Sequence, residues 1–137
     1  MAAEPVLQAL ILADHIYQDK DTGKKVIAGT FSQLWSAQFP NTFGRTTYAY
    51  VCLTGLHGQT EICLRYRDLR TPEILLESPP IRFNWDDPLQ SVELIIEVPP
   101  FPMPREGVYA FELHANGRML GSVRISVGKR EDRSNAR

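Results

Sequence analysis

The sequence lacks a long apolar run. Nowhere in its 137 residues is there a stretch of the roughly 20 apolar residues that a membrane-spanning helix needs. The first 13 residues include an apolar segment, but this segment has no basic residues before it and contains Glu4 and Gln8, so it does not resemble a secretion signal. We therefore expect a buried strand there, no membrane association and a cytoplasmic protein.

Cysteine and histidine are scarce. The two cysteines, Cys52 and Cys63, are not accompanied by the clustered histidines that would complete a zinc site. Both lie at outward-facing positions of consecutive predicted strands, so a disulfide between them is geometrically conceivable. We expect two reduced thiols instead, because opposed cysteines on strands give strained bonds and a cytoplasmic chain stays reduced.

The chain has no excess of charge of either sign. Fifteen basic and sixteen acidic residues leave a formal net charge of -1, whereas a dedicated nucleic-acid binder normally carries a clear basic excess. The sequence also contains no assembled nucleophile, base or cofactor motif. We expect no nucleic-acid partner, no cofactor and no enzymatic activity.

A helical period is missing as well, and strict alternation takes its place. Apolar residues recur at every second position along 92–98, 109–113 and 123–127, which is typical of strands with one face on a core. Turn residues separate the alternating segments throughout the chain. Predicted strands cover approximately residues 6–17, 25–35, 46–54, 60–69, 71–76, 89–98, 107–115 and 119–127, and the segment 81–85 is either another short strand or an edge segment.

This pattern predicts an all-β protein, a two-layer antiparallel β-sandwich of seven to eight strands. A closed barrel would need the same number of strands, but Pro79-Pro80 and the prolines of 99–104 indicate sheet edges or crossings between sheets. We expect one domain over residues 1–128 and a disordered charged tail over 129–137. The segments 46–54 and 60–69 are predicted to pair as a hairpin.

The last hairpin allows a prediction of register. A two-residue loop at Asn116-Gly117 would set apolar residues of one strand beside polar residues of the next, which a one-sided core forbids. A three-residue loop, 115–117, pairs Leu113 with Met119 and Tyr109 with Val123, and Gly117 then occupies the left-handed position of a bulge. We therefore predict the three-residue loop.

The aromatic residues outside the regular core pattern are the candidate binding site. Large apolar side chains in loops either cap the end of a sandwich core or form a binding surface. Two tyrosines at outward-facing strand positions would enlarge such a surface, and the first strand is apolar on both faces, so that a partner could cover it. The candidate residues are Trp35, Phe39, Phe43, Tyr48, Tyr50 and Trp85.

Other charged groups are weaker candidates. Asp19, Asp21 and Gly23 resemble part of a calcium loop, and Asp86-Asp87 could contribute at the same end of a sandwich, but the EF-hand spacing is incomplete. Arg65 and Arg67 alternate onto one face and could bind an acidic partner. We expect a solvated turn and a solvated outer face in these places.

The closing segment resembles the end of many bacterial immunoglobulin-like domains. The matching residues are 104–113 and 116–122, Pro-Arg-Glu-Gly-Val-Tyr-Ala-Phe-Glu-Leu and Asn-Gly-Arg-Met-Leu-Gly-Ser. Over 6–127 the chain is similar to an uncharacterised bacterial family of small immunoglobulin-like sandwich proteins, a domain of unknown function. The resemblance implies the fold and supplies no active residues. The functional hypothesis is a non-enzymatic module that binds a protein partner or itself, with a calcium- or small-ligand-binding module as the alternative.

Overall fold

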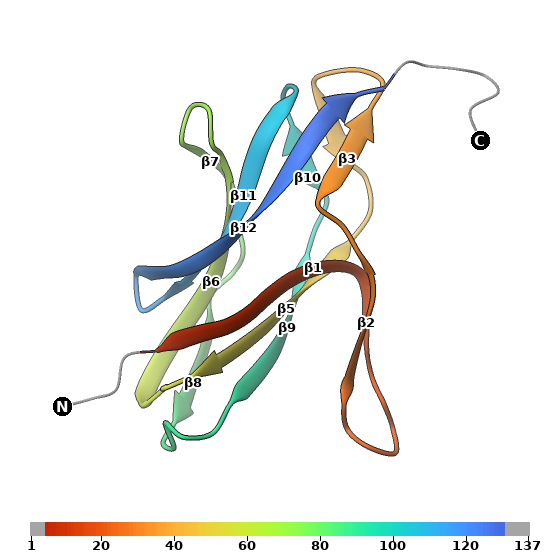
Figure 1. Cartoon of the computed structure of the whole chain (residues 1–137). Helices are drawn as coiled ribbons and strands as arrows, with labels where there is room; N and C mark the ends of the chain where they lie inside the picture. The colour runs from red at the N-terminus through yellow and green to blue at the C-terminus, as the bar shows by residue number, and fades with distance from the viewer. Residues whose placement is uncertain (1–4, 131–137) are drawn as a thin grey trace.

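The computed structural model describes residues 5–130, which form strands joined by turns and loops, without helix. Figure 1 shows that the strands are arranged in two layers. The strands are β1 (Val6–Gln18), β2 (Lys25–Thr30), β3 (Gln33–Ser36), β4 (Asn41–Phe43), β5 (Thr47–Thr54), β6 (Gly58–Asp68), β7 (Glu73–Glu77), β8 (Ile81–Trp85), β9 (Val92–Val98), β10 (Phe101–Met103), β11 (Gly107–Ala115) and β12 (Arg118–Lys129).

The strands form two main sheets and one small sheet. The four-stranded sheet has the order β2-β1-β5-β9. The six-stranded sheet has the order β3-β12-β11-β6-β7. Strand β7 pairs with the C-terminal half of β6, and β8 pairs with its N-terminal half. Strands β10 and β4 form the two-stranded sheet. All pairs are antiparallel except β3 with β12.

The core lies between the two main sheets, as the alternation predicts. Every second residue of β5 is buried, and Val51 and Leu53 are completely enclosed. On β6 the inward residues Ile62 and Leu64 meet them from the opposite sheet. The prediction of an all-β two-layer sandwich is therefore confirmed. The twelve strands exceed the seven to eight expected, because prolines and short breaks divide several extended segments.

The predicted hairpin of β5 with β6 is wrong. Strand β5 pairs with β1 and β9, whereas β6 pairs with β11, β7 and β8, so the short connection after Thr54 crosses from one sheet to the other. Cys52 and Cys63 are free thiols at outward positions of these two strands. They consequently lie on opposite faces of the sandwich, and no disulfide can join them without unfolding.

The predicted three-residue loop at 115–117 is also wrong. Ala115 pairs with Arg118, and Asn116 and Gly117 have φ values of 52° and 81°, which is the two-residue type I′ turn. The extra residue that the face-matching argument requires lies further along β12. His114 pairs with Met119 and Leu113 with Gly121, so a bulge at Leu120 restores the apolar register.

The prolines lie where sheets end or change. Pro79-Pro80 separates β7 from β8, the two strands that pair with β6 at the edge of the six-stranded sheet, which confirms the predicted sheet edge. Pro99-Pro100 and Pro104 flank β10, through which the chain passes from the four-stranded to the six-stranded sheet. Strand β12 ends at Lys129, one residue into the predicted tail; the tail residues 131–137 lie outside the described residues.

Tyr109 fixes the entry to β11. Its hydroxyl donates a hydrogen bond to the carbonyl oxygen of Arg105 and accepts one from the amide of Arg105 at 3.2 Å. The side chain is completely buried near the start of the strand. A buried tyrosine bonded to the backbone four residues upstream is the tyrosine corner of immunoglobulin-like sandwiches.

Gly29 is expected to be intolerant of a side chain. Its φ is +77°, and an added Cβ would lie 2.7 Å from Oδ2 of Asp14, a carboxylate that Arg45 holds at 3.0 Å. Gly29→Ala should therefore lower the free energy of unfolding by about 1–3 kcal/mol. Gly44→Ala is the control, because its new Cβ would meet nothing within 4 Å. Urea unfolding of both variants tests this, and equal stability of the two would contradict it.

Candidate functional site

The structure does not gather the six candidate aromatic residues on one surface. Phe39, Phe43 and Trp85 are half-buried and pack against the core. The ring of Phe43 stacks on Phe101 at 5.1 Å between centroids, and Trp85 Nε1 donates to the carbonyl oxygen of Asp87 at 2.9 Å. These three side chains therefore close the edges of the core.

Trp35 lies apart from the other aromatics. It is 56% exposed and projects from the outer face of the six-stranded sheet at its β3 edge. Its ring covers Gly128 of β12, where an added Cβ would lie 2.6 Å from Trp35 Cζ3. The glycine thus provides the flat backbone on which the indole rests.

Tyr48 and Tyr50 lie on the outer face of the four-stranded sheet, as predicted. Tyr50 pairs with Ile11 of β1 on one side and with Ile95 of β9 on the other. This gives an unbroken apolar row across three strands, with Tyr48 in the next row. We call this surface, formed by Ile11, Tyr48, Tyr50 and Ile95, the tyrosine face. Ile95 is 39% exposed, although an outer sheet face is ordinarily polar.

A polar group anchors one end of the tyrosine face. The Tyr50 hydroxyl donates a hydrogen bond to the carboxylate of Glu93, and Lys25 Nζ lies 3.3 Å from the same carboxylate. The hydrogen bond to Glu93 raises the pKa of Tyr50 and lowers the pKa of Glu93. Because Lys25 comes from β2, the β1–β2 hairpin borders this face, and the phenol of Tyr50 is fixed in one orientation.

The opposite face of the molecule holds a charge cluster that the sequence analysis did not find. The Arg67 guanidinium donates to both carboxylate oxygens of Glu112, at 2.8 and 3.2 Å. His114 Nε2 lies 3.0 Å from the same carboxylate, and the Glu112 side chain is only 9% exposed. Arg65 pairs separately with Glu77 at 2.8 Å. The predicted solvated stripe is in fact a set of paired and largely covered arginines.

Cys63 lies beside this cluster. It pairs directly with His114 across the β6–β11 ladder, and both line an open groove of about 530 Å³ together with Glu77, Pro79 and Pro80. Burial, with a contribution from nearby Glu77, raises the pKa of the Cys63 thiol. Nucleophilic cysteines have a lowered pKa in a basic environment, so these residues do not have the features of a thiol catalyst.

The aspartates proposed as a calcium site hold their own turns together. The carboxylate of Asp19 accepts hydrogen bonds from the amide of Asp21 and the hydroxyl of Thr22, which lower the pKa of Asp19. The carboxylate of Asp87 accepts one from the amide of Leu89 at 3.1 Å. Within residues 5–130, no group of three or more His, Cys, Asp or Glu side chains is placed to hold a metal ion. The same residues contain no helix suited to crossing a membrane.

The topology and the tyrosine corner together define the class. Strands β12, β11 and β6 form a sheet extended by β7 and β8 on the far side of β6, and β1, β5 and β9 form the sheet that faces it. This is the arrangement of the G, F and C strands with C′, opposed by A, B and E, in immunoglobulin domains. The protein is thus an immunoglobulin-like β-sandwich, as the resemblance implied.

Residues 8–128 match the model of a family of unknown function, DUF6941, and the chain belongs to that family. A search of curated proteins found no match. Among solved structures, the alkylpurine DNA glycosylase AlkC of Pseudomonas fluorescens, bound to DNA with an abasic site analogue, is similar with a TM-score of 0.57 and 10% identity. That match covers 92% of this chain and 31% of the glycosylase, so the chain spans about a third of that protein.

An immunoglobulin-like protein of Pseudomonas aeruginosa is similar at a TM-score of 0.43 and 14% identity, over 91% of this chain and 97% of that one. At such identities the likeness to the glycosylase shows a shared fold, and neither structure transfers an activity.

Proposed function

We propose that this protein is a non-enzymatic module that binds a protein partner through the tyrosine face. The observation that carries the proposal is the unbroken row of Ile11, Tyr50 and Ile95 across the outside of the four-stranded sheet. A solvated sheet face would alternate to polar residues at these positions. Leaving apolar side chains there gains nothing for folding, whereas covering them with a partner is favourable.

The composition of the face supports a protein partner. Tyrosine is enriched in protein interfaces because its large ring gives contact area at a low cost in conformational entropy, and its hydroxyl remains available for hydrogen bonds. Tyr50 is already oriented by Glu93. The net charge of -1 supports a protein rather than a nucleic acid as the partner.

The location is part of the proposal. We propose that the protein works in the bacterial cytoplasm, and the two unpaired thiols on opposite faces are compatible with that reducing compartment. Cell fractionation with an antibody against the protein tests this, and recovery in the periplasm or the medium would refute it.

Ile95→Lys is expected to weaken partner binding through the tyrosine face. Ile95 and Val108 are β-branched strand residues with 39% and 40% exposure, but Val108 lies on the outer face of the opposite sheet. Replacing Ile95 puts a charge at the β9 end of the apolar row, which should weaken partner binding at least about tenfold, as a desolvated charge at an interface does. Val108→Lys should leave binding unchanged.

The measurement is cross-linking of the tagged protein in its own host, followed by mass spectrometry of the cross-linked species. Light scattering over a range of concentrations decides whether the partner is a second copy. If the Ile95→Lys protein retains the same cross-linked species as the Val108→Lys protein, with both folded by circular dichroism, the tyrosine face is not the binding surface.

A further inference from the structure

The six-stranded sheet extends further than the sheet that covers it. The inward side of β7 and β8 is identified by the register, since Leu76 lies opposite Tyr66, Ile81 opposite Ile62, and Phe83 opposite Thr60. Those partners on β6 are buried, yet Leu76, Ile81, Phe83 and Trp85 are only half-buried. These four apolar side chains face inward without a complete layer above them.

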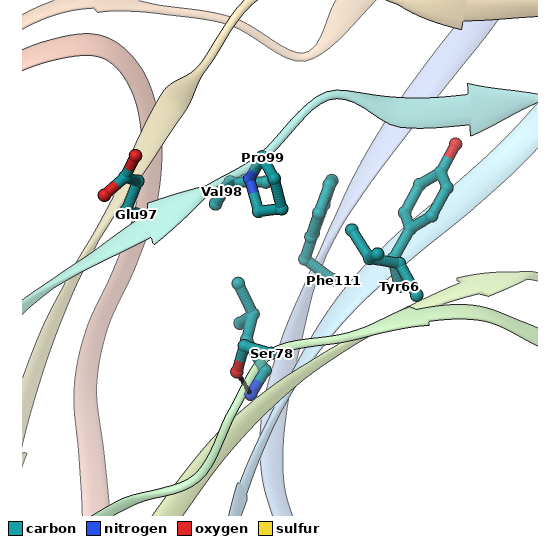
Figure 2. A pocket seen from close by; sticks show the side chains of 8 residues that line it. Tyr66, Ser78, Glu97, Val98, Pro99 and Phe111 are labelled. Carbon is teal, nitrogen blue, oxygen red and sulfur yellow. Dashed lines mark hydrogen bonds between the residues drawn. The ribbon is translucent and has the colours of Figure 1, made fainter.

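The four-stranded sheet stops at β9. In residues 5–130, β9 (Val92–Val98) pairs only with β5, so its second edge is free of strand pairing. Figure 2 shows the space beside this edge, with Val98 and Pro99 above it, Ser78 below it, and Phe111 and Tyr66 on the right. The enclosed volume is about 10 Å³, room for no more than one water molecule. The opening therefore does not suit a small ligand.

An added strand would fit this open side. A strand paired with the free edge of β9 would lie above β7 and β8 in the position that strand D occupies beside strand E in immunoglobulin domains. It would satisfy the unpaired backbone groups of β9 and cover the four half-buried side chains. Backbone hydrogen bonds supply affinity in such strand addition, and alternate side chains supply specificity.

We propose that an extended segment of a partner protein adds to β9 as a further strand, with apolar side chains inward and basic side chains outward. The inward side chains would contact Leu76, Ile81 and Phe83. The outward positions would lie next to Glu93 and Glu97, both of which are exposed on the outer face of β9. The inference rests on the proposed function in that the partner is a protein, but it uses a different part of the surface.

The same acids argue against other occupants. If β9 of a second copy paired antiparallel about Ile95, each Glu93 would lie directly opposite the other copy's Glu97, and like charges directly opposite are destabilising. Residues 131–137, Glu-Asp-Arg-Ser-Asn-Ala-Arg, are no better suited, because they include no large apolar residue to place inward. A basic and apolar alternating strand is complementary to this edge.

A synthetic peptide tests the proposal. The probe is acetyl-Lys-Val-Lys-Ile-Lys-Val-Lys-amide, and the control peptide has the same residues in the order Lys-Lys-Lys-Lys-Val-Ile-Val. We expect the alternating peptide, at a saturating concentration, to slow hydrogen exchange at the β9 amides about tenfold or more. The control peptide should not slow it. In a Trp35→Phe background the alternating peptide should also shift the fluorescence of Trp85, the only tryptophan then left in the chain.

Two variants give the matched comparison. Leu76→Lys places a charge on the inward side of β7, whereas Ile74→Lys places one on the opposite face, since Ile74 pairs with Arg67 and is 43% exposed. Leu76→Lys should weaken peptide binding about tenfold or more, and Ile74→Lys should not. Equal binding of the two peptides, equal effects of the two folded variants, or absence of protection at β9 would overturn the proposal.

A second copy at the edge is also distinguishable. Protection of β9 that rises with protein concentration in the absence of peptide would replace the partner segment by self-pairing and overturn the proposal. Failure of the peptide with loss of the cellular partner in Ile95→Lys would refute strand addition alone. If the alternating peptide binds but Ile95→Lys does not weaken binding of the cellular partner, the tyrosine face is refuted as the partner's binding surface and strand addition is not.

Discussion

Replacing Phe111 with alanine should lower the free energy of unfolding by about 3–5 kcal/mol, as is typical for removal of a buried aromatic ring. Phe111 is 1% exposed. Its ring centroid lies 4.8 Å from that of Tyr66 and 5.3 Å from that of Phe101, so it joins the six-stranded sheet to β10. The neighbouring strands are held in their ladders and cannot close the resulting cavity, which adds to the lost transfer energy.

Urea unfolding at equilibrium measures this loss. Val108→Ala, on the same strand but facing solvent, is the control and should change stability by less than about 1 kcal/mol. A loss below about 1.5 kcal/mol for Phe111→Ala would mean that the cavity is refilled and that the aromatic cluster is not the rigid centre of the core.

Removal of the Glu112 carboxylate should be about as damaging as removal of a core ring. Glu112→Ala is expected to cost about 3–5 kcal/mol, because it leaves the Arg67 guanidinium with no carboxylate in a mostly covered position. The side chains of Arg67 and Glu112 are 22% and 9% exposed. Glu112→Gln should cost less, since an amide oxygen can still accept one hydrogen bond from Arg67. Similar small losses in both variants would show that water replaces the carboxylate.

The same residue should give the protein part of its acid sensitivity. Burial alone would raise the pKa of Glu112, but the hydrogen bonds from Arg67 and His114 outweigh it and hold that pKa below its usual value of 4.5. A lowered pKa in the folded state stabilises the protein above pH 4.5, and this contribution is lost as the pH falls through the folded value. Unfolding curves between pH 7 and pH 3 should therefore show a shallower loss for Glu112→Gln than for the native protein.

Strand positions were predictable from the sequence, but the partner of each strand was not. The alternation at Val51 and Leu53, and again at Ile62 and Leu64, correctly gave the core-facing residues. Both sheets share one core, however, so a hairpin and a crossing between sheets produce the same alternation. The connection after Thr54 contains Leu56, a buried apolar residue, which a solvated hairpin loop would not need.

In the final hairpin, too, the sequence predicted which residues face the core but not how the two strands pair. The rule that apolar faces must match correctly required one extra residue in the pairing of β11 with β12. It did not say where that residue lies, because a bulge in the turn and a bulge at Leu120 both match the apolar faces. The predicted turn pairs Tyr109 with Val123, whereas the structure pairs Tyr109 with Ile125 and Phe111 with Val123. Asn116-Gly117 itself carried the information, since this dipeptide is the preferred type I′ turn.

The candidate site was predicted only in part. The alternation of side chains along the strand correctly predicted that Tyr48 and Tyr50 lie on an outer face. Their neighbours Ile11 and Ile95, however, come from strands that are distant in the sequence. Glu112 and His114 lie on the outer face of the other sheet, yet tertiary contacts bury both. Side chains from β6 cover these two residues, and no local pattern in the sequence predicts this burial. Partner binding by the six aromatic residues stays a prediction.

The crossing of the chain from β5 to β6 bears on how quickly the protein can fold. Each layer draws strands from both halves of the sequence, with β1 and β9 in one and β3 and β12 in the other. Most pairings therefore join distant segments, and such topologies fold in milliseconds to seconds rather than microseconds. During synthesis the four-stranded layer cannot be completed before β9 has emerged from the ribosome, and the six-stranded layer cannot be completed before β12 has emerged.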